Sequence, residues 1–145
     1  MSLVTPQVWK VSARLLAYET RENLTQASRT PATLLVCEKL RPPLASLMGH
    51  TGFRSLLARA LSLANIEASW PGVVQVKADG TLAGWDKLEG QIPRKDFAEA
   101  SAVLIARLLG LLVAFIGEEL TFRLLREIWP EVTLNPDLLM TEENK

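Results

Sequence analysis

Apolar residues recur every three or four positions through the first half of this chain, which is the spacing of a helix with one buried face. Thr5-Pro6 and Thr30-Pro31 each combine a good N-cap with a proline that leaves no amide hydrogen unpaired, so two helices are predicted to begin there. Pro42-Pro43 is predicted to kink the second helix or divide it in two, and Gly49 to end it. A third helix is predicted after Thr51. The residues expected to be buried on these faces are Val8, Val11, Leu15, Tyr18, Val36, Leu40, Leu44, Leu47, Phe53, Leu56, Leu57, Ala60, Leu61 and Ala64.

Two stretches break the helical pattern. Residues 23–28 are polar and unperiodic, which predicts a loop. Farther on, Asp79-Gly80 separates two short apolar segments and is typical of a two-residue hairpin turn, so a β-hairpin is predicted near residues 73–85. That register pairs Ala78 with Thr81 and Val76 with Ala83. A lone hairpin is barely stable, so its apolar face must dock on the helices; this face comprises Val74, Val76 and Trp85.

The most hydrophobic segment runs from Ala102 to Ile116 and is interrupted only by Arg107. A helix that is apolar nearly all round is a central one, covered by neighbours on most sides. Small residues recur every four positions and form a smooth face for a neighbouring helix, namely Ala102, Ala106, Gly110 and Ala114. Bulky residues form the face beside it, namely Phe97, Leu104, Leu108, Leu111 and Phe115.

Gly117 is predicted to bend or end this helix, and a further helix follows it up to Pro130. Glu119 is expected to face Arg123 at a spacing of four residues. The predicted apolar stripe of this helix comprises Leu120, Leu124, Leu125 and Ile128.

These patterns predict a mainly α protein, a single compact bundle of four to five helices around a central apolar helix with one small β-hairpin. A length of 145 residues suits one domain. We expect that domain to comprise residues 1–130 and residues 131–145 to form a loosely attached C-terminal tail.

The apolar segment is too short and too interrupted to predict a membrane span. Its ten strong hydrophobes favour insertion by roughly 3–6 kcal/mol, while an arginine near the middle costs about 3 kcal/mol. It is also shorter than the roughly 20 residues that a span requires. The first residues lack a charged and apolar export signal, so a cytoplasmic location is expected.

The formal net charge is zero, but it is unevenly distributed along the sequence. Residues 1–66 carry eight Lys and Arg against three Glu, a balance of +5, and the remainder carries a balance of −5. Such polarity lets basic and acidic surfaces meet within or between subunits, or lets a basic surface hold an anionic partner. The candidate contacts for an anion or a partner are Lys10, Arg14, Arg21, Arg54 and Arg59.

Catalytic and cofactor signatures are absent from the sequence. There is no phosphate-binding glycine loop, no dinucleotide fingerprint and no nucleophile elbow. Cys37 lies among apolar neighbours and is expected to be a buried, inert thiol rather than the partner of His50 in a nucleophilic pair. His50 is expected to be a loop residue or to form a hydrogen bond at a helix start, and Glu118 and Glu119 diverge on their helix. No catalytic residue, metal site or cofactor is therefore predicted.

The sequence therefore favours a non-enzymatic helical interaction module, an adaptor or regulator acting through protein–protein contacts, with a homodimer as one form. A first alternative is a nucleic-acid-binding regulator that uses the basic N-terminal half. Residues 44–49 and the helix after them resemble a helix-turn-helix, but His50 and Ser55 occupy positions where that motif packs hydrophobes. A second alternative is a helical protein that binds a small apolar ligand.

Overall fold

The computed structural model describes residues 4–25, 30–71, 74–132 and 134. Within them the chain forms six helices and two short strands: α1 (Pro6–Thr25), α2 (Ala32–Met48), α3 (His50–Ala68), β1 (Gln75–Val76), β2 (Leu82–Ala83), α4 (Trp85–Gln91), α5 (Arg94–Ile116) and α6 (Glu118–Ile128). The prediction of a mainly α protein with a small hairpin is confirmed. The short helix α4 is the element that the periodicity did not indicate.

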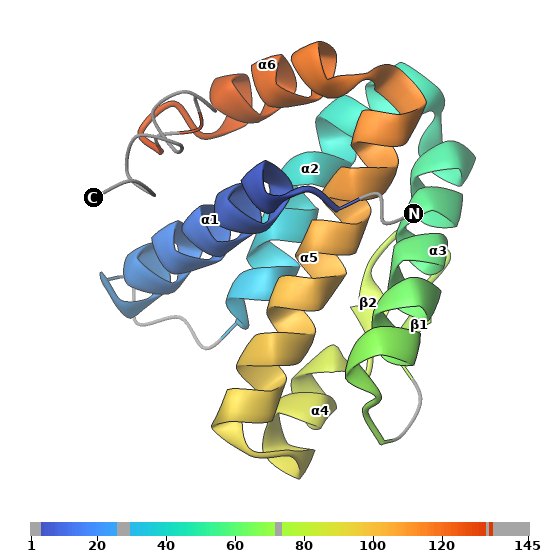
Figure 1. The fold of residues 1–145 in the computed structure, drawn as a ribbon. Helices are drawn as coiled ribbons and strands as arrows, with labels where there is room; N and C mark the ends of the chain where they lie inside the picture. The colour runs from blue at the N-terminus through green and yellow to red at the C-terminus, as the bar shows by residue number, and fades with distance from the viewer. Residues whose placement is uncertain (1–3, 26–29, 72–73, 133, 135–145) are drawn as a thin grey trace.

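α5 lies at the centre of the bundle (Figure 1). It packs against α3, α1 and α6, and α2 packs against both α1 and α3. The interior of α5 is buried, as the run of apolar residues predicts; its fully buried side chains include Leu104, Ile105, Ala106, Leu108 and Leu112. Burial of this helix organises the hydrophobic core, because the other elements cover it from several sides.

Several helix boundaries follow the predicted signals. The Thr5 hydroxyl oxygen accepts a hydrogen bond from the Val8 amide at 3.3 Å, which caps α1. Gly49 ends α2 and Gly117 ends α5, with φ values of 83° and 92° that favour glycine. The predicted loop at residues 23–28 is wrong for residues 23–25, which continue α1; residues 26–28 lie outside the described residues. The Asn23 side chain donates to the Thr30 carbonyl at 2.7 Å and so joins the end of α1 to the start of α2.

Pro42 and Pro43 lie inside α2, which continues through them, so the predicted division into two helices is wrong. Each proline removes one amide donor, and the carbonyls four residues earlier, in Glu38 and Lys39, lose their helical partners. Both of these residues are exposed, so water can hydrogen-bond to their carbonyl oxygens. The helix therefore tolerates the prolines on its solvent side.

The hairpin is present, but its predicted register is wrong by one residue. Val76 pairs with Leu82 instead of Ala83. The loop has three residues rather than two, since the Lys77 amide donates to the Thr81 carbonyl at 2.7 Å and the Gly80 amide to the Lys77 carbonyl at 2.9 Å. Gly80, with φ 85°, supplies the left-handed residue that such a three-residue loop requires.

This shift changes which residues of the hairpin reach the core. Leu82 is buried on β2, while Trp85 belongs to α4 and not to a strand. The Trp85 ring packs edge-on against Trp70, with ring centroids 5.4 Å apart, and also contacts Phe97. These aromatic contacts attach α4 to the rest of the bundle.

The last turn of α5 and the first turn of α6 reach beyond the packed core. Ala114 and Phe115 were predicted to belong to the small and the bulky packed faces of α5. Ala114 is exposed and Phe115 is 67% exposed, so neither face packs against a neighbour in this last turn. The predicted stripe of α6 is also partly wrong: Leu125 is buried, but Leu120 is 38% exposed, and Phe122 and Trp129 supply the rest of the buried face. Leu134 is buried as well, so packing continues past Pro130; residues 135–145 lie outside the described residues.

Candidate functional site

The five basic residues singled out from the sequence lie on two separate helices. Lys10, Arg14 and Arg21 belong to α1, and Arg54 and Arg59 belong to α3. α1 and α3 pack on different sides of α5 (Figure 1). The Arg54 side chain donates to the Lys77 carbonyl at 3.2 Å, which holds it against the hairpin. The fold therefore does not bring the five residues together on one face.

Cys37 and His50 lie near the hairpin but lack the features of a nucleophilic pair. Cys37 is buried, and burial raises the pKa of its thiol to about 12, which keeps the sulfur protonated at neutral pH. The exposed His50 ring donates through Nε2 to the Ala78 carbonyl at 2.9 Å. Both observations agree with the expected structural roles of these residues. No cluster of three metal-ligating side chains occurs among the described residues.

Three ion pairs among the described residues each join two residues of the same half of the chain. Lys39 pairs with Glu19, Arg107 with Glu67, and Arg123 with Glu119 at 3.6 Å, the last as predicted from their spacing. Pairing of the basic half with the acidic half thus stays a prediction.

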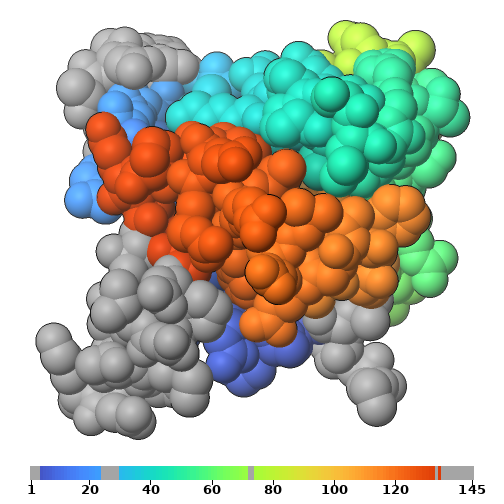
Figure 2. Space-filling view, turned by 90° about the horizontal axis from the view of Figure 1, so that it is seen from above, coloured from blue at the N-terminus to red at the C-terminus, as the bar shows by residue number. Residues whose placement is uncertain are grey.

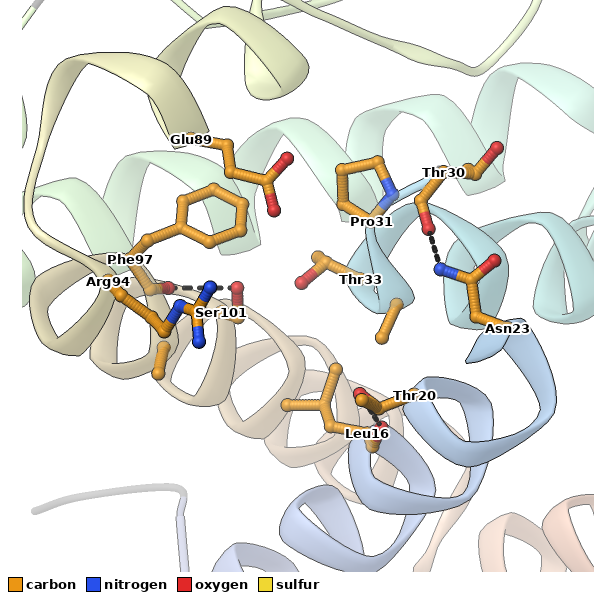
Figure 3. Close-up of a pocket in the computed structure, with 12 residues that line it drawn as sticks. Leu16, Thr20, Asn23, Thr30, Pro31, Thr33, Glu89, Arg94, Phe97 and Ser101 are labelled. Carbon is orange, nitrogen blue, oxygen red and sulfur yellow. Dashed lines mark hydrogen bonds between the residues drawn. The ribbon is translucent and has the colours of Figure 1, made fainter. Parts of the chain in front are cut away.

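A pocket of about 330 Å³ lies where α1, the start of α2, α4 and the start of α5 meet (Figure 3). Its walls are mainly apolar, and the Phe97 ring and Leu16 form two of them. An engineered apolar cavity of about 150 Å³ holds benzene, so this pocket has room for roughly a dozen non-hydrogen atoms. That is the size of a small organic molecule.

One buried hydroxyl that lines this pocket has no hydrogen-bond partner in the described part of the chain. Thr33 is 1% exposed, yet its hydroxyl oxygen has no hydrogen-bond partner. Figure 3 shows this oxygen turned toward the space between Ser101 and Leu16. The Ser101 hydroxyl donates to the Phe97 carbonyl at 2.9 Å and keeps its lone pairs free to accept. A buried hydroxyl without a partner costs roughly 1–3 kcal/mol, which a bound polar molecule would recover.

Two opposite charges border the same pocket. Glu89 on α4 and Arg94 at the start of α5 are both exposed and line it. Figure 3 shows the Glu89 carboxylate and the Arg94 guanidinium near the Phe97 ring, at the edge of the pocket. Within the described residues the two side chains form no salt bridge with each other. The pocket thus offers one carboxylate and one guanidinium to a guest.

Sequence reasoning missed this pocket, because its residues come from four segments far apart in the chain. Thr33 follows Thr30-Pro31 by only two positions, and that segment was interpreted as a helix start alone. A hydroxyl in the first turn of an amphipathic helix is common, so its inward direction becomes apparent only in the fold.

A second surface feature is the corner where α5 ends and α6 begins, which we call the α5–α6 corner. It comprises Phe115, Ile116, Gly117, Glu118, Glu119, Leu120 and Arg123. A surface hollow of about 460 Å³ lies here, lined by all of these residues except Phe115. Figure 2 shows α6 and the end of α5 forming one continuous exposed surface, bordered by the turn between α2 and α3. Leu47, near the end of α2, is 49% exposed.

By length and composition alone, α5 is long and apolar enough to cross a membrane. Of its most apolar stretch of 18 residues, 61% is buried inside the fold. A buried core helix and a membrane span both satisfy this description, so the absence of a span stays a prediction.

Comparison of the chain with protein-family models, with curated proteins and with solved structures finds no match.

Proposed function

We propose that this protein is a helical interaction module, an adaptor or regulator, that pairs with a second copy of itself through the α5–α6 corner. The observation that carries the proposal is Phe115, a large aromatic side chain 67% exposed at the end of the central helix. Exposed aromatic residues next to other apolar side chains are typical of protein contact surfaces.

The corner offers both a projection and a hollow. Phe115 is exposed, and the lining of the neighbouring hollow includes Ile116, Leu120 and Arg123, beside Gly117 and two glutamates. Two apolar side chains and a guanidinium, which stacks well on aromatic rings, suit an inserted phenyl ring. In a twofold dimer each copy inserts its projection into the hollow of the other, because both copies use the same surface.

The charges of α6 favour an antiparallel arrangement of the two copies. Glu119 lies in the first turn of α6 and Arg123 one turn later, and both are exposed. When two α6 helices pack antiparallel through their exposed faces, with the contact centred midway between Glu119 and Arg123, Glu119 of each copy lies beside Arg123 of the other. Such complementarity fixes the orientation of the contact.

Nucleic-acid binding has less support, since the candidate basic residues are divided between α1 and α3. Affinity for duplex DNA depends on several basic groups that reach phosphates together.

Light scattering coupled to size-exclusion chromatography tests the proposal. The wild-type protein is expected to approach twice the mass of one chain as its concentration rises, and Phe115→Ser to remain a monomer. Ile66→Ser is the matched control, because Ile66 is also an exposed hydrophobe, 81% exposed on α3, outside the corner. A wild-type monomer at every concentration, or a Phe115→Ser dimer, would overturn the proposal.

A further inference from the structure

We infer that the pocket between α1, α2, α4 and α5 binds a small zwitterion with an apolar side chain, the chemistry of a free amino acid such as leucine, methionine or phenylalanine. This inference goes beyond the proposed self-association and is independent of it. The pocket lies at the start of α5, about 25 Å along the helix from Phe115.

The size and the lining set the apolar part of the ligand. The volume of about 330 Å³ admits roughly a dozen non-hydrogen atoms, by comparison with a cavity that holds benzene. Leu16, Pro31 and Phe97 offer apolar contact. A branched or aromatic side chain of amino-acid size fits these walls, whereas a nucleotide or a sugar phosphate would leave many polar groups unpaired against them.

The two charges at the edge of the pocket set the polar part. A simple anion would be attracted by Arg94 but repelled by Glu89, and a simple cation would meet the reverse. A zwitterion satisfies both: its carboxylate pairs with the guanidinium, and its ammonium group pairs with the Glu89 carboxylate. Opposite charges that border one pocket therefore select a molecule that carries both charges.

Thr33 supports a ligand in this pocket independently of the pocket's volume and of the two charges at its edge. The residue is 1% exposed, its hydroxyl lacks a partner, and Figure 3 shows the oxygen turned into the pocket. The hydroxyl can donate to the carboxylate of the guest, while the free lone pairs of the Ser101 hydroxyl can accept from its ammonium group.

Isothermal titration with leucine, methionine and phenylalanine tests the inference, with two analogues of leucine as matched controls. 4-Methylpentanoate has the carboxylate without the amine, and 3-methylbutylamine has the amine without the carboxylate. At least one of the three amino acids is expected to bind. Each analogue is expected to bind about tenfold or more weakly than leucine, the cost of one charge-assisted contact.

Variants of the pocket complete the test. Arg94→Gln and Glu89→Gln are each expected to weaken binding about tenfold. Lys95→Gln and Asp86→Asn, which change exposed neighbours outside the pocket lining, are expected to leave binding unchanged. Thr33→Val is expected to weaken binding while raising the midpoint of urea unfolding of the empty protein, because it removes an unpartnered buried hydroxyl.

Three results would overturn the inference. The first is no binding of any of the three amino acids. The second is binding of 4-methylpentanoate as tight as that of leucine and insensitive to Glu89→Gln. The third is binding that survives both charge variants. None of them affects the proposed dimer, because Phe115→Ser changes the other end of α5 and is expected to bind the amino acid like the wild-type protein.

Discussion

Glu19 is a buried carboxylate that joins three segments of the chain. It is 2% exposed on α1, and its Oε2 atom accepts from Lys39 on α2 at 2.5 Å and from the Trp129 indole at 2.7 Å. A charge in such a position is stabilised mainly by its hydrogen bonds, since the Lys39 side chain is 43% exposed and its attraction is screened. The sequence offered no sign of this role, because both partners are distant in the chain.

Replacement of Glu19 tests this arrangement. Glu19→Ala is expected to lower the free energy of unfolding by about 2–4 kcal/mol, because it leaves the buried Trp129 indole without an acceptor and opens a cavity. Glu19→Gln keeps an acceptor for the indole and is expected to cost roughly half as much. Urea unfolding measures both values. Equal losses for the two variants would show that the hydrogen bond to the indole is unimportant.

Gly80 shows how backbone conformation constrains a single position. It has φ 85°, and a Cβ atom there would lie 3.2 Å from Arg41 Cδ. Gly80→Ala is expected to destabilise the protein by about 1–2 kcal/mol. Gly90→Ala in α4 is the control, since a Cβ there meets nothing within 4 Å, and it is expected to stabilise by up to about 1 kcal/mol. The midpoint temperatures of thermal unfolding of the two variants should therefore shift in opposite directions from that of the wild type. A shift of both midpoints in the same direction would contradict this account of the hairpin.

Cys37 gives a prediction that depends on pH. Burial raises the pKa of its thiol from an ordinary 9.0 to about 12, so at pH 8 the native protein carries about a thousandfold less thiolate than the unfolded chain. The thiol is expected to react slowly with a disulfide reagent in buffer and rapidly in denaturant. Because the folded protein retains the proton, stability is expected to be full below pH 9 and to fall as the pH rises toward 12. Labelling at equal rates in buffer and denaturant would refute burial.

At the scale of elements, helix positions followed from the sequence more reliably than strand register or exposure. Thr5-Pro6, Gly49 and Gly117 act locally, and their effects were predicted. The hairpin register depended on whether the loop had two or three residues, and Asp79-Gly80 suits both. The exposure of Phe115 depends on where the helices that pack against α5 end. The sequence pattern of α5 alone cannot indicate this.

Close packing along α5 is testable at one position. Ala106 is fully buried in the middle of this helix. Ala106→Leu is expected to destabilise the protein by about 1–3 kcal/mol, since a well-packed core has no volume for the larger side chain. Ala58→Leu on the exposed face of α3 is the control and should change stability by less than about 0.5 kcal/mol. An unchanged urea midpoint for Ala106→Leu would mean that the small residues of α5 do not serve close packing.

At the scale of the whole molecule, the bundle was predictable, whereas the two surfaces proposed to bind a partner or a ligand were not. The apolar run from Ala102 to Ile116 indicated a central helix around which the others pack, and the structure confirms it. The pocket forms only where four separate segments of the chain converge. The α5–α6 corner is exposed because the last turn of α5 extends beyond the helices that pack against it. Both depend on tertiary geometry, so neither could be found by inspection of local patterns.

The central proposal is that two copies pair antiparallel through the α5–α6 corner, and a charge-swap experiment followed by native mass spectrometry tests it most directly. Glu119→Arg and Arg123→Glu each place like charges opposite one another across the twofold axis, so each variant alone is expected to dimerise roughly tenfold more weakly than the wild type. A mixture of the two variants restores opposite charges, and heterodimers are expected to form about as well as wild-type dimers. Wild-type affinity in either variant alone, or a mixture that stays monomeric, would contradict the proposal.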